Sequence, residues 1–263
     1  MILIKIGGGA SINLKGIVAD IATLRDPCVL VHGANHFRDQ LAQNLGKTKQ
    51  VITSTSGYSS VYSDETAIDL LMMAYAGYRN KRLVELCQQH GINAIGLSGL
   101  DGRMIQGQRN KGIRVQEGEK VRIVRDFSGK PKAINKELLE LLMSHGYTPV
   151  LSVPIIDENG FAINSENDDI VTLLQETLHA EKIIQLIEAP GFLDNKEDMT
   201  SVVKKISREE LPQRESQVEG RMKRKLLALR KLFESGAQTV ILSDGRVENP
   251  ILDALQGKGT LIQ

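Results

Sequence analysis

The chain has 263 residues and a formal net charge of +1, with 41% hydrophobic and 25% charged residues. A chain of this size buries a large core, as one α/β domain or as two smaller lobes. The absence of tryptophan argues against a stacking surface for nucleic acid, and no apolar run is long enough to cross a membrane. Two cysteines are too few for a disulfide framework, so we expect buried, reduced thiols in a cytoplasmic protein.

In chain order, short apolar runs that predict strands alternate with amphipathic stretches that predict helices. We expect strands at 2–6, 28–31, 94–97, 148–153, 183–187 and 239–242, and helices at 14–24, 37–45, 66–90, 136–144, 168–179 and 221–234. This alternation predicts an α/β fold with a largely parallel sheet and helices on both faces. Residues 112–127 instead predict a β-hairpin, which we interpret as a lid, and the polar stretch 195–217 is expected to wind over the surface.

The first strand runs directly into three glycines, Gly7 to Gly9, ahead of an expected helix. Glycines at a strand-to-helix turn let backbone N–H groups approach an anion, and Lys5 precedes this turn, where its ammonium can reach a phosphate. The segment is neither a Walker A loop nor the spaced dinucleotide fingerprint. A tight turn without a ligand would also explain the glycines, so other motifs have to decide.

A second strand ends in a similar way, at His32-Gly33-Ala34-Asn35. Because parallel strands bind ligands at their carboxyl ends, both glycine turns should face one crevice. We interpret His32 as a structural hydrogen-bonding residue rather than a base. Asn35 is as well suited to cap the next helix as to contact a ligand.

Two further helix starts carry charged side chains. The segment 164–169 places acids in a first helical turn, which the helix dipole favours, and Asn164 or Ser165 is the expected cap. The basic run that precedes Lys225 opposes the dipole instead. A nearby anion would explain this run, and a solvated basic face is the alternative.

Lys5 and Lys225, with Asp168 between them, would make a coherent phosphoryl-transfer site. Positioned cations stabilise the charge that develops during transfer without a covalent step. No cluster with metal-ligand spacing competes for this chemistry, so Mg²⁺ would arrive with the nucleotide.

On these motifs the chain resembles the amino acid kinase family, and within it the N-acetylglutamate kinase branch. The matching segments follow the family's order along nearly the whole chain: Lys5-Ile6-Gly7-Gly8, Val31-His32-Gly33, Asn164-x3-Asp168, Gly220-x-Met222-x-x-Lys225 and Gly259-Thr260. Within the branch, the chain is most similar to aminoadipate kinases that act on a carrier-bound substrate, through residues 80–86, 96–103, 220–225 and 244–250.

The resemblance implies an open αβα sandwich with a mainly parallel central sheet, and ATP, bound with Mg²⁺, as the phosphoryl donor. Residues 1–179 would form a lobe for the substrate, the carrier and dimerisation, and residues 180–263 a nucleotide-binding lobe. The acceptor would be the side-chain carboxylate of α-aminoadipate or glutamate on a small acidic amino-group carrier protein. The pathway would be lysine biosynthesis, or arginine biosynthesis as well, and the protein would be a homodimer.

The same resemblance assigns roles to individual residues. Lys5 and Lys225 would stabilise the transferring phosphoryl group, and Asp168 would organise them. The residues that would contact the phosphates and the nucleotide are Gly7, Gly8, Gly220 and Met222. Those that would contact the substrate are Gly33, Ala34, Val61 and Asn164. Basic residues of the first lobe would steer an acidic carrier, unless they are ordinary surface charges: Lys47, Lys49, Arg79, Lys81, Arg82, Arg103, Arg109, Lys111 and Arg114.

Position 61 departs from the family pattern, because Val61 stands where the family places an arginine that clamps the substrate's free carboxylate. A hydrogen bond of this charged type is worth about 1.5–3 kcal/mol, and valine cannot replace it. Either the substrate lacks that carboxylate, or another cation replaces the arginine, or the register of the resemblance is shifted by a few residues. Lys15, Lys47 and Lys49 are candidate substitutes, and our hypothesis is an acyl kinase with a different substrate.

Three other functions stay open at this point. A free-standing N-acetylglutamate kinase of arginine biosynthesis would need the missing arginine more, and a dual enzyme would serve both pathways. A non-catalytic nucleotide-binding regulator is the third, but a mere binder needs no lysine pair at a transferring phosphate.

Overall fold

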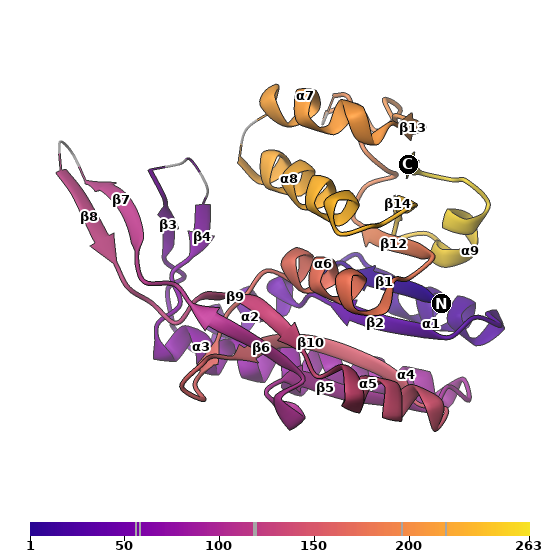
Figure 1. The fold of residues 1–263 in the computed structure, drawn as a ribbon, viewed down its shortest axis with the longest axis horizontal. Coiled ribbons are helices and arrows are strands. Elements are labelled where there is room, and N and C mark those ends of the chain that lie inside the picture. Colours follow the sequence, from indigo (N-terminus) through magenta and orange to yellow (C-terminus); the bar gives the residue numbers. More distant parts are fainter. Residues whose placement is uncertain (56, 58, 118–119, 196, 219) are drawn as a thin grey trace.

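A central sheet with helices on both faces forms the framework of the protein (Figure 1). The computed structural model describes residues 1–55, 57, 59–117, 120–195, 197–218 and 220–263, and of residues 59, 117 and 220–222 it describes the backbone alone. Within these residues, eleven strands form one sheet in the order β13-β15-β14-β12-β1-β2-β10-β6-β9, with β5 and β11 paired to β10. Most neighbouring strands are parallel, so the predicted α/β fold with a mainly parallel sheet is confirmed.

The strands of this sheet are β1 (Ile2–Ile6), β2 (Cys28–His32), β5 (Ala94–Gly99), β6 (Ile105–Arg109), β9 (Gly129–Ile134), β10 (Thr148–Ile156), β11 (Ala162–Ile163), β12 (Lys182–Ile187), β13 (Lys205–Ile206), β14 (Val240–Asp244) and β15 (Thr260–Ile262). The α-helices are α1 (Leu14–Thr23), α2 (Asn35–Asn44), α3 (Glu65–Leu71), α4 (Asn80–Gln89), α5 (Lys136–Ser144), α6 (Asn167–Leu178), α7 (Leu211–Ser216), α8 (Gly220–Glu234) and α9 (Pro250–Leu255). A π-helical segment, η1 (Met72–Arg79), joins α3 to α4, and short 3₁₀ turns occupy η2 (Asp101–Arg103) and η3 (Arg208–Glu210).

Strand β1 is central, because β2 and β12 pair with it on either side. Successive side chains of a strand point to opposite faces of the sheet. Ile2, Ile4 and Ile6 join the core beneath α1, α4 and α9, whereas Leu3 joins the core beneath α6 and α8. Lys5 therefore points toward the α6 and α8 face.

Two β-hairpins project from the same side of the sheet (Figure 1). The predicted hairpin at 112–127 is confirmed as β7 (Ile113–Glu117) and β8 (Lys120–Val124), although residues 118–119 of its turn lie outside the described chain. The second hairpin, β3 (Val51–Thr53) and β4 (Ser59–Val61), was not predicted from the sequence. The N–H of Thr55 donates to the Arg114 carbonyl at 2.8 Å, so the two hairpins support each other.

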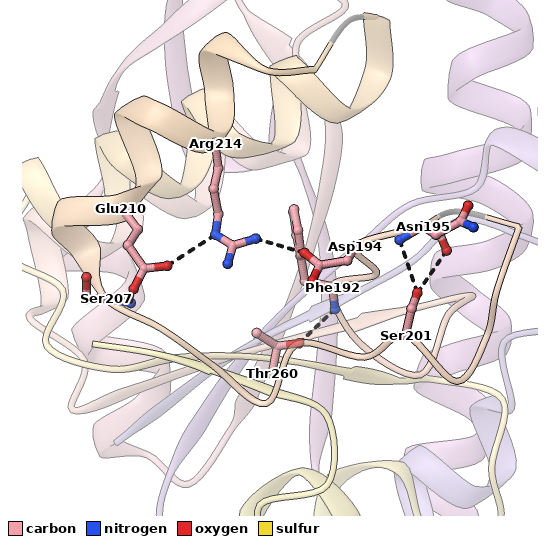
Figure 2. A network of polar contacts seen from close by, with 8 residues as sticks. All are labelled: Phe192, Asp194, Asn195, Ser201, Ser207, Glu210, Arg214 and Thr260. Carbon is pink, nitrogen blue, oxygen red and sulfur yellow. Dashed lines mark hydrogen bonds and ion pairs between the residues drawn. The ribbon is translucent and has the colours of Figure 1, made fainter.

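Residues 195–217, which we expected to wind over the surface, also contain regular elements and buried side chains. This stretch contains β13, η3 and α7, and Ile206 and Leu211 are fully buried. Figure 2 shows a contact that anchors the segment: Arg214 donates to Asp194 at 3.0 Å and to Glu210 at 3.3 Å, and so joins the preceding loop to α7. The helix α7 could not be predicted from the sequence, because it is short and has a single buried apolar residue, Leu211, at its start.

The same close-up shows how the loop after β12 is fastened to the last strand. The N–H of Phe192 donates to Thr260 Oγ1 at 2.7 Å, and the Arg214 guanidinium lies 5.6 Å from the centre of the Phe192 ring (Figure 2). Gly191 permits this contact, because a Cβ there would lie 2.7 Å from Thr260 Oγ1. The C-terminal part of the sheet is thus held together by polar contacts as well as by its core.

The two cysteines are free and buried, as expected from the sequence. Cys28 is 6% exposed and Cys87 fully buried, and burial raises the pKa of the two thiols to about 11 and about 12 respectively. Among the helices of the described residues, none combines the length and the apolar character that a membrane span requires.

His32 is fully buried at the end of β2 and has the structural role predicted for it. The side-chain amide of Asn80 donates to its Nε2 at 3.1 Å and to the Val150 carbonyl at 3.0 Å, and the Nδ1 of His32 lies 3.3 Å from the Gly33 carbonyl. These contacts suit a neutral ring, and burial lowers the pKa of His32 to about 3. The residue therefore fixes the backbone ahead of the second glycine turn and is not poised to act as a base.

We predict that the protein loses stability as the pH falls from about 6.5 toward 3, because His32 stays neutral in the folded state. The unfolded chain takes up the proton near pH 6.5, whereas the folded protein excludes it down to about pH 3, so this stability is complete only above the upper value. Each pH unit in the window should cost up to about 1.4 kcal/mol. Urea unfolding across this range measures the slope, which should be shallower in His32→Gln; equal slopes would contradict the prediction.

Candidate functional site

The site begins with an ion pair between Lys5 on β1 and Asp168 in the first turn of α6. The Lys5 ammonium donates to Asp168 Oδ1, and the side chains are 14% and 20% exposed. Alternation along β1 turns Lys5 toward α6, and α6 contacts both β1 and β2. An acid in the first turn of a helix is favoured by the helix dipole, so both the dipole and the Lys5 ammonium stabilise the charge of Asp168 at this position.

Lys225, the sixth residue of α8, completes a cluster of three charges. Burial, and then the positive charge of Lys5, lower its pKa from the ordinary 10.5, and Asp168 partly opposes them. These influences require Lys5 and Asp168 to lie near the Lys225 ammonium. The structure thus brings together the three side chains that the sequence singled out as catalytic.

The two glycine turns pack directly against each other beside this cluster. A Cβ on Gly33 would lie 2.9 Å from the Cα of Gly8, and a Cβ on Gly8 would lie 2.1 Å from the Asn35 side-chain oxygen. Neither position can accept a larger residue, because the obstructing atoms include backbone. The expected convergence of both turns on one place is therefore observed.

Two of the N–H groups expected to bind an anion are already engaged. Gly7 donates to the Leu186 carbonyl and Gly33 to the Ile6 carbonyl, each at 2.9 Å. This corrects the prediction that these two N–H groups contact phosphate or substrate; their glycines serve close approach instead. The N–H of Gly8 has no acceptor among the described residues, and it remains the candidate donor of the first turn.

Both helix caps expected near the site differ from the prediction. The cap position of α2 is occupied by Ala34, which is fully buried. Asn35, the expected cap, is instead the first residue of the helix. Glu166, rather than Asn164 or Ser165, precedes α6, and neither helix receives a side-chain cap bond. The first-turn N–H groups are therefore left without the side-chain acceptor that the sequence seemed to supply.

The polar turn before α6 reaches toward the β3–β4 hairpin. The Asn164 amide donates to Ser63 Oγ at 3.1 Å, and Ser63 Oγ donates to the Val61 carbonyl at 3.2 Å. The expected substrate residues Asn164 and Val61 are therefore neighbours through one serine. Ser165 Oγ is buried and has no hydrogen-bond partner among the described residues.

Two further ion pairs join the start of α6 to α8. Glu166 pairs with Arg224 at 2.6 Å, and Asp169 pairs with Lys231 at 3.2 Å. The basic run at the start of α8 thus has a protein counter-charge in Glu166, so the expected ligand anion is not needed to explain Arg224. These pairs hold α8 against α6 on both sides of Lys225.

The remaining expected ligand residues are Gly220 and Met222. Gly220 is the first residue of α8, but the side chains of residues 220–222 lie outside the described structure. In the part of the chain that is described, no three His, Cys, Asp or Glu side chains gather as metal ligands would.

Comparisons with known proteins show the family and the fold of the chain. A model of the amino acid kinase family matches residues 1–243. The chain is 39% identical to [LysW]-aminoadipate kinase of Thermus thermophilus and 31% identical to [LysW]-aminoadipate/[LysW]-glutamate kinase of Sulfolobus acidocaldarius, in both cases over 100% of both chains. Its fold is similar to that of a Giardia carbamate kinase, with a TM-score of 0.69 and 16% identity over 99% of this chain and 97% of that one.

We predict that Lys225 titrates below pH 10.5 and that its two charged neighbours move this pKa in opposite directions. Asp168→Asn should lower the pKa further, because it removes the charge that favours the ammonium, and Lys5→Met should raise it. Titration of labelled lysine side chains by NMR measures both shifts. Asp169→Asn is the matched control, since Asp169 pairs with Lys231 and should leave Lys225 unchanged. Shifts of the opposite sign would refute the arrangement.

Proposed function

The chain belongs to the amino acid kinase family, and from that premise we propose that it transfers the γ-phosphoryl group of ATP to a carboxylate on a carrier-bound amino acid. The acceptor is the side-chain carboxylate of α-aminoadipate or glutamate, attached to a small acidic carrier protein, and the product is an acyl phosphate of lysine or arginine biosynthesis. The observation that carries the proposal is the cluster of Lys5, Asp168 and Lys225 beside the two glycine turns.

The chemistry asks for charge stabilisation rather than for a base. A carboxylate oxygen of the acceptor attacks the γ-phosphorus, the bond from this phosphorus to the bridging oxygen breaks, and ADP leaves with that electron pair. Because the acceptor is already ionised, no proton has to be removed, and the neutral, buried His32 is consistent with that. Positioned cations of this kind can contribute on the order of 10²–10³ in rate.

The residues of the site have separate roles in the proposed reaction. Lys5 and Lys225 offset negative charge on the transferring group, and Asp168 holds Lys5 in place. The Gly8 N–H and the Ser165 hydroxyl, both without protein partners among the described residues, are suited to phosphate oxygens. Mg²⁺ would enter with the nucleotide and shield the phosphate charge.

We propose the same division of labour between the two parts of the chain as the family resemblance implies. Residues 1–179 bind the acceptor, with Gly33, Ala34 and Asn164 beside it, and residues 180–263 bind the nucleotide, with Gly220 and Met222 among its contacts. We also propose a homodimer formed through residues 1–179. Met73 and Tyr78 on η1 are 47% and 49% exposed and would supply apolar surface to this dimer interface.

The acidic carrier would approach the basic side chains of the first part. Arg79 has to be removed from that set, because it is only 5% exposed. Lys111 on the β7–β8 side and Lys47 after α2 are exposed, and opposite charges on partners raise the rate of encounter. A carrier held near the hairpins would bring its amino acid to the Asn164 end of the site.

Trapping of the acyl phosphate with hydroxylamine tests this function. With Mg-ATP, we expect hydroxamate from the carrier charged with α-aminoadipate, from the carrier charged with glutamate, or from both. Free N-acetylglutamate should give none, and Lys225→Met should lower the yield by about 10²-fold or more. Product from free N-acetylglutamate alone would move the assignment to arginine synthesis on a free substrate, and ATP binding without any hydroxamate would favour a non-catalytic regulator.

A further inference from the structure

The β3–β4 ribbon places a lysine beside the position of the missing arginine. Val51 pairs with Val61 across the ribbon, and the ladder continues because the Tyr62 N–H donates to the Gln50 carbonyl at 2.9 Å. Lys49 comes directly before Gln50, the last residue of this ladder, and if the alternation continued by one residue its side chain would share the face of Val51 and Val61. Diagonal neighbours on one face of such a ribbon lie about 7–8 Å apart, within reach of a long side chain.

The Lys49 ammonium is held in place by an acid of α2. It donates to Asp39 Oδ2 at 2.6 Å, and Arg38 donates to Asp39 Oδ1 at 2.6 and 2.9 Å. Burial acts to raise the pKa of Asp39, but the hydrogen bonds from Lys49 and Arg38 outweigh it, and the pKa lies below its ordinary value. Two cations thus share one carboxylate, which leaves one positive charge for a further anion.

This cation pair lies on the acceptor side of the proposed site. The ladder ends with Gln50 beside Tyr62, so Lys49 and Ser63 are the next residues along the two arms of the ribbon. Ser63 Oγ accepts the Asn164 amide at 3.1 Å, and Asn164 is the residue proposed to contact the acceptor. The Lys49 side chain is 35% exposed, so it remains accessible to a ligand.

The other candidate cations fail this geometry. Lys15 belongs to α1, which packs on the Ile2, Ile4 and Ile6 face of β1, opposite to the face of Lys5. Lys47 lies before the ribbon, in the turn that ends α2, where its N–H donates to the Ala42 carbonyl at 2.8 Å. Of the three lysines, Lys49 is the one directly next to the paired residues of the ribbon.

We propose that Lys49, held by Asp39 beside Arg38, binds the free α-carboxylate of the acceptor amino acid in place of the arginine that the family has at position 61. The inference rests on the proposed function, since it concerns the acceptor of that reaction. It favours the second explanation of Val61, a substituted cation, over a substrate without a carboxylate.

Calorimetric binding of two charged carriers tests the inference without need of turnover. One carrier bears α-aminoadipate with its α-carboxylate free, and the other bears the same residue as the α-carboxamide. Lys49→Met should weaken binding of the first about 10- to 100-fold, because a charge-assisted bond is lost, and leave the second within about threefold. Lys258→Met is the matched control, since Lys258 also pairs with an aspartate, Asp253 at 2.8 Å, far along the chain.

A second variant separates carboxylate recognition from a structural effect. In the Lys49→Met background, Val61→Arg should restore most of the lost affinity for the carboxylate carrier, because it supplies a cation at the neighbouring position. Equal loss for both carriers in Lys49→Met, or a gain of tenfold or more from Val61→Arg alone, would overturn the inference. If the wild type binds free N-acetylglutamate but neither carrier, the proposed carrier-bound substrate falls, and this inference falls with it.

Discussion

The ion pair between Lys5 and Asp168 is the contact on which the rest of the site depends. It ties the central strand to the first turn of α6, and it sets one negative charge between two ammonium groups. Without that charge, Lys5 and Lys225 would repel each other in a partly buried place, where water screens charges poorly. The site is therefore possible only because an acid and two lysines reach one point from three separate elements.

Three acids at the start of α6, one in the cap position and two in the first turn, each pair with a different partner. Asp168 holds β1 through Lys5, and Glu166 and Asp169 hold α8 through Arg224 and Lys231. Each of these contacts also places negative charge where the helix dipole favours it. Because Arg224 and Lys231 flank Lys225 along α8, the same turn that carries the central acid also determines where the second lysine stands.

Much of this could be predicted from the sequence, because it depends on local rules. A strand that ends in glycines, an acid at a helix start, a lysine before the glycine turn and a second lysine near the start of another helix together indicate phosphate chemistry. Alternation along β1 settles the direction of Lys5. The mainly parallel sheet and the β7–β8 hairpin follow in the same way from periodicity.

The features that escaped prediction depend on distant partners. The N–H of Gly7 is engaged by Leu186, and the Arg224 charge is matched by Glu166, neither of which any local pattern reveals. The strands β3 and β4 have only three residues each, which is too short for a period-2 pattern to be recognised. Only the pairing of these strands shows that Lys49 lies next to the ladder that carries Val61. The sequence alone could therefore not choose Lys49 as the cation that replaces the missing arginine.

The measurement that tests the central claim most directly is the single-turnover rate of acyl-phosphate formation in Asp168→Asn, taken with the dissociation constant for Mg-ATP. If Asp168 organises the two lysines around the transferring group, the rate should fall about 10²-fold or more, while nucleotide affinity stays within about threefold. A rate close to that of the wild type, with Lys5 and Lys225 unchanged, would contradict the account.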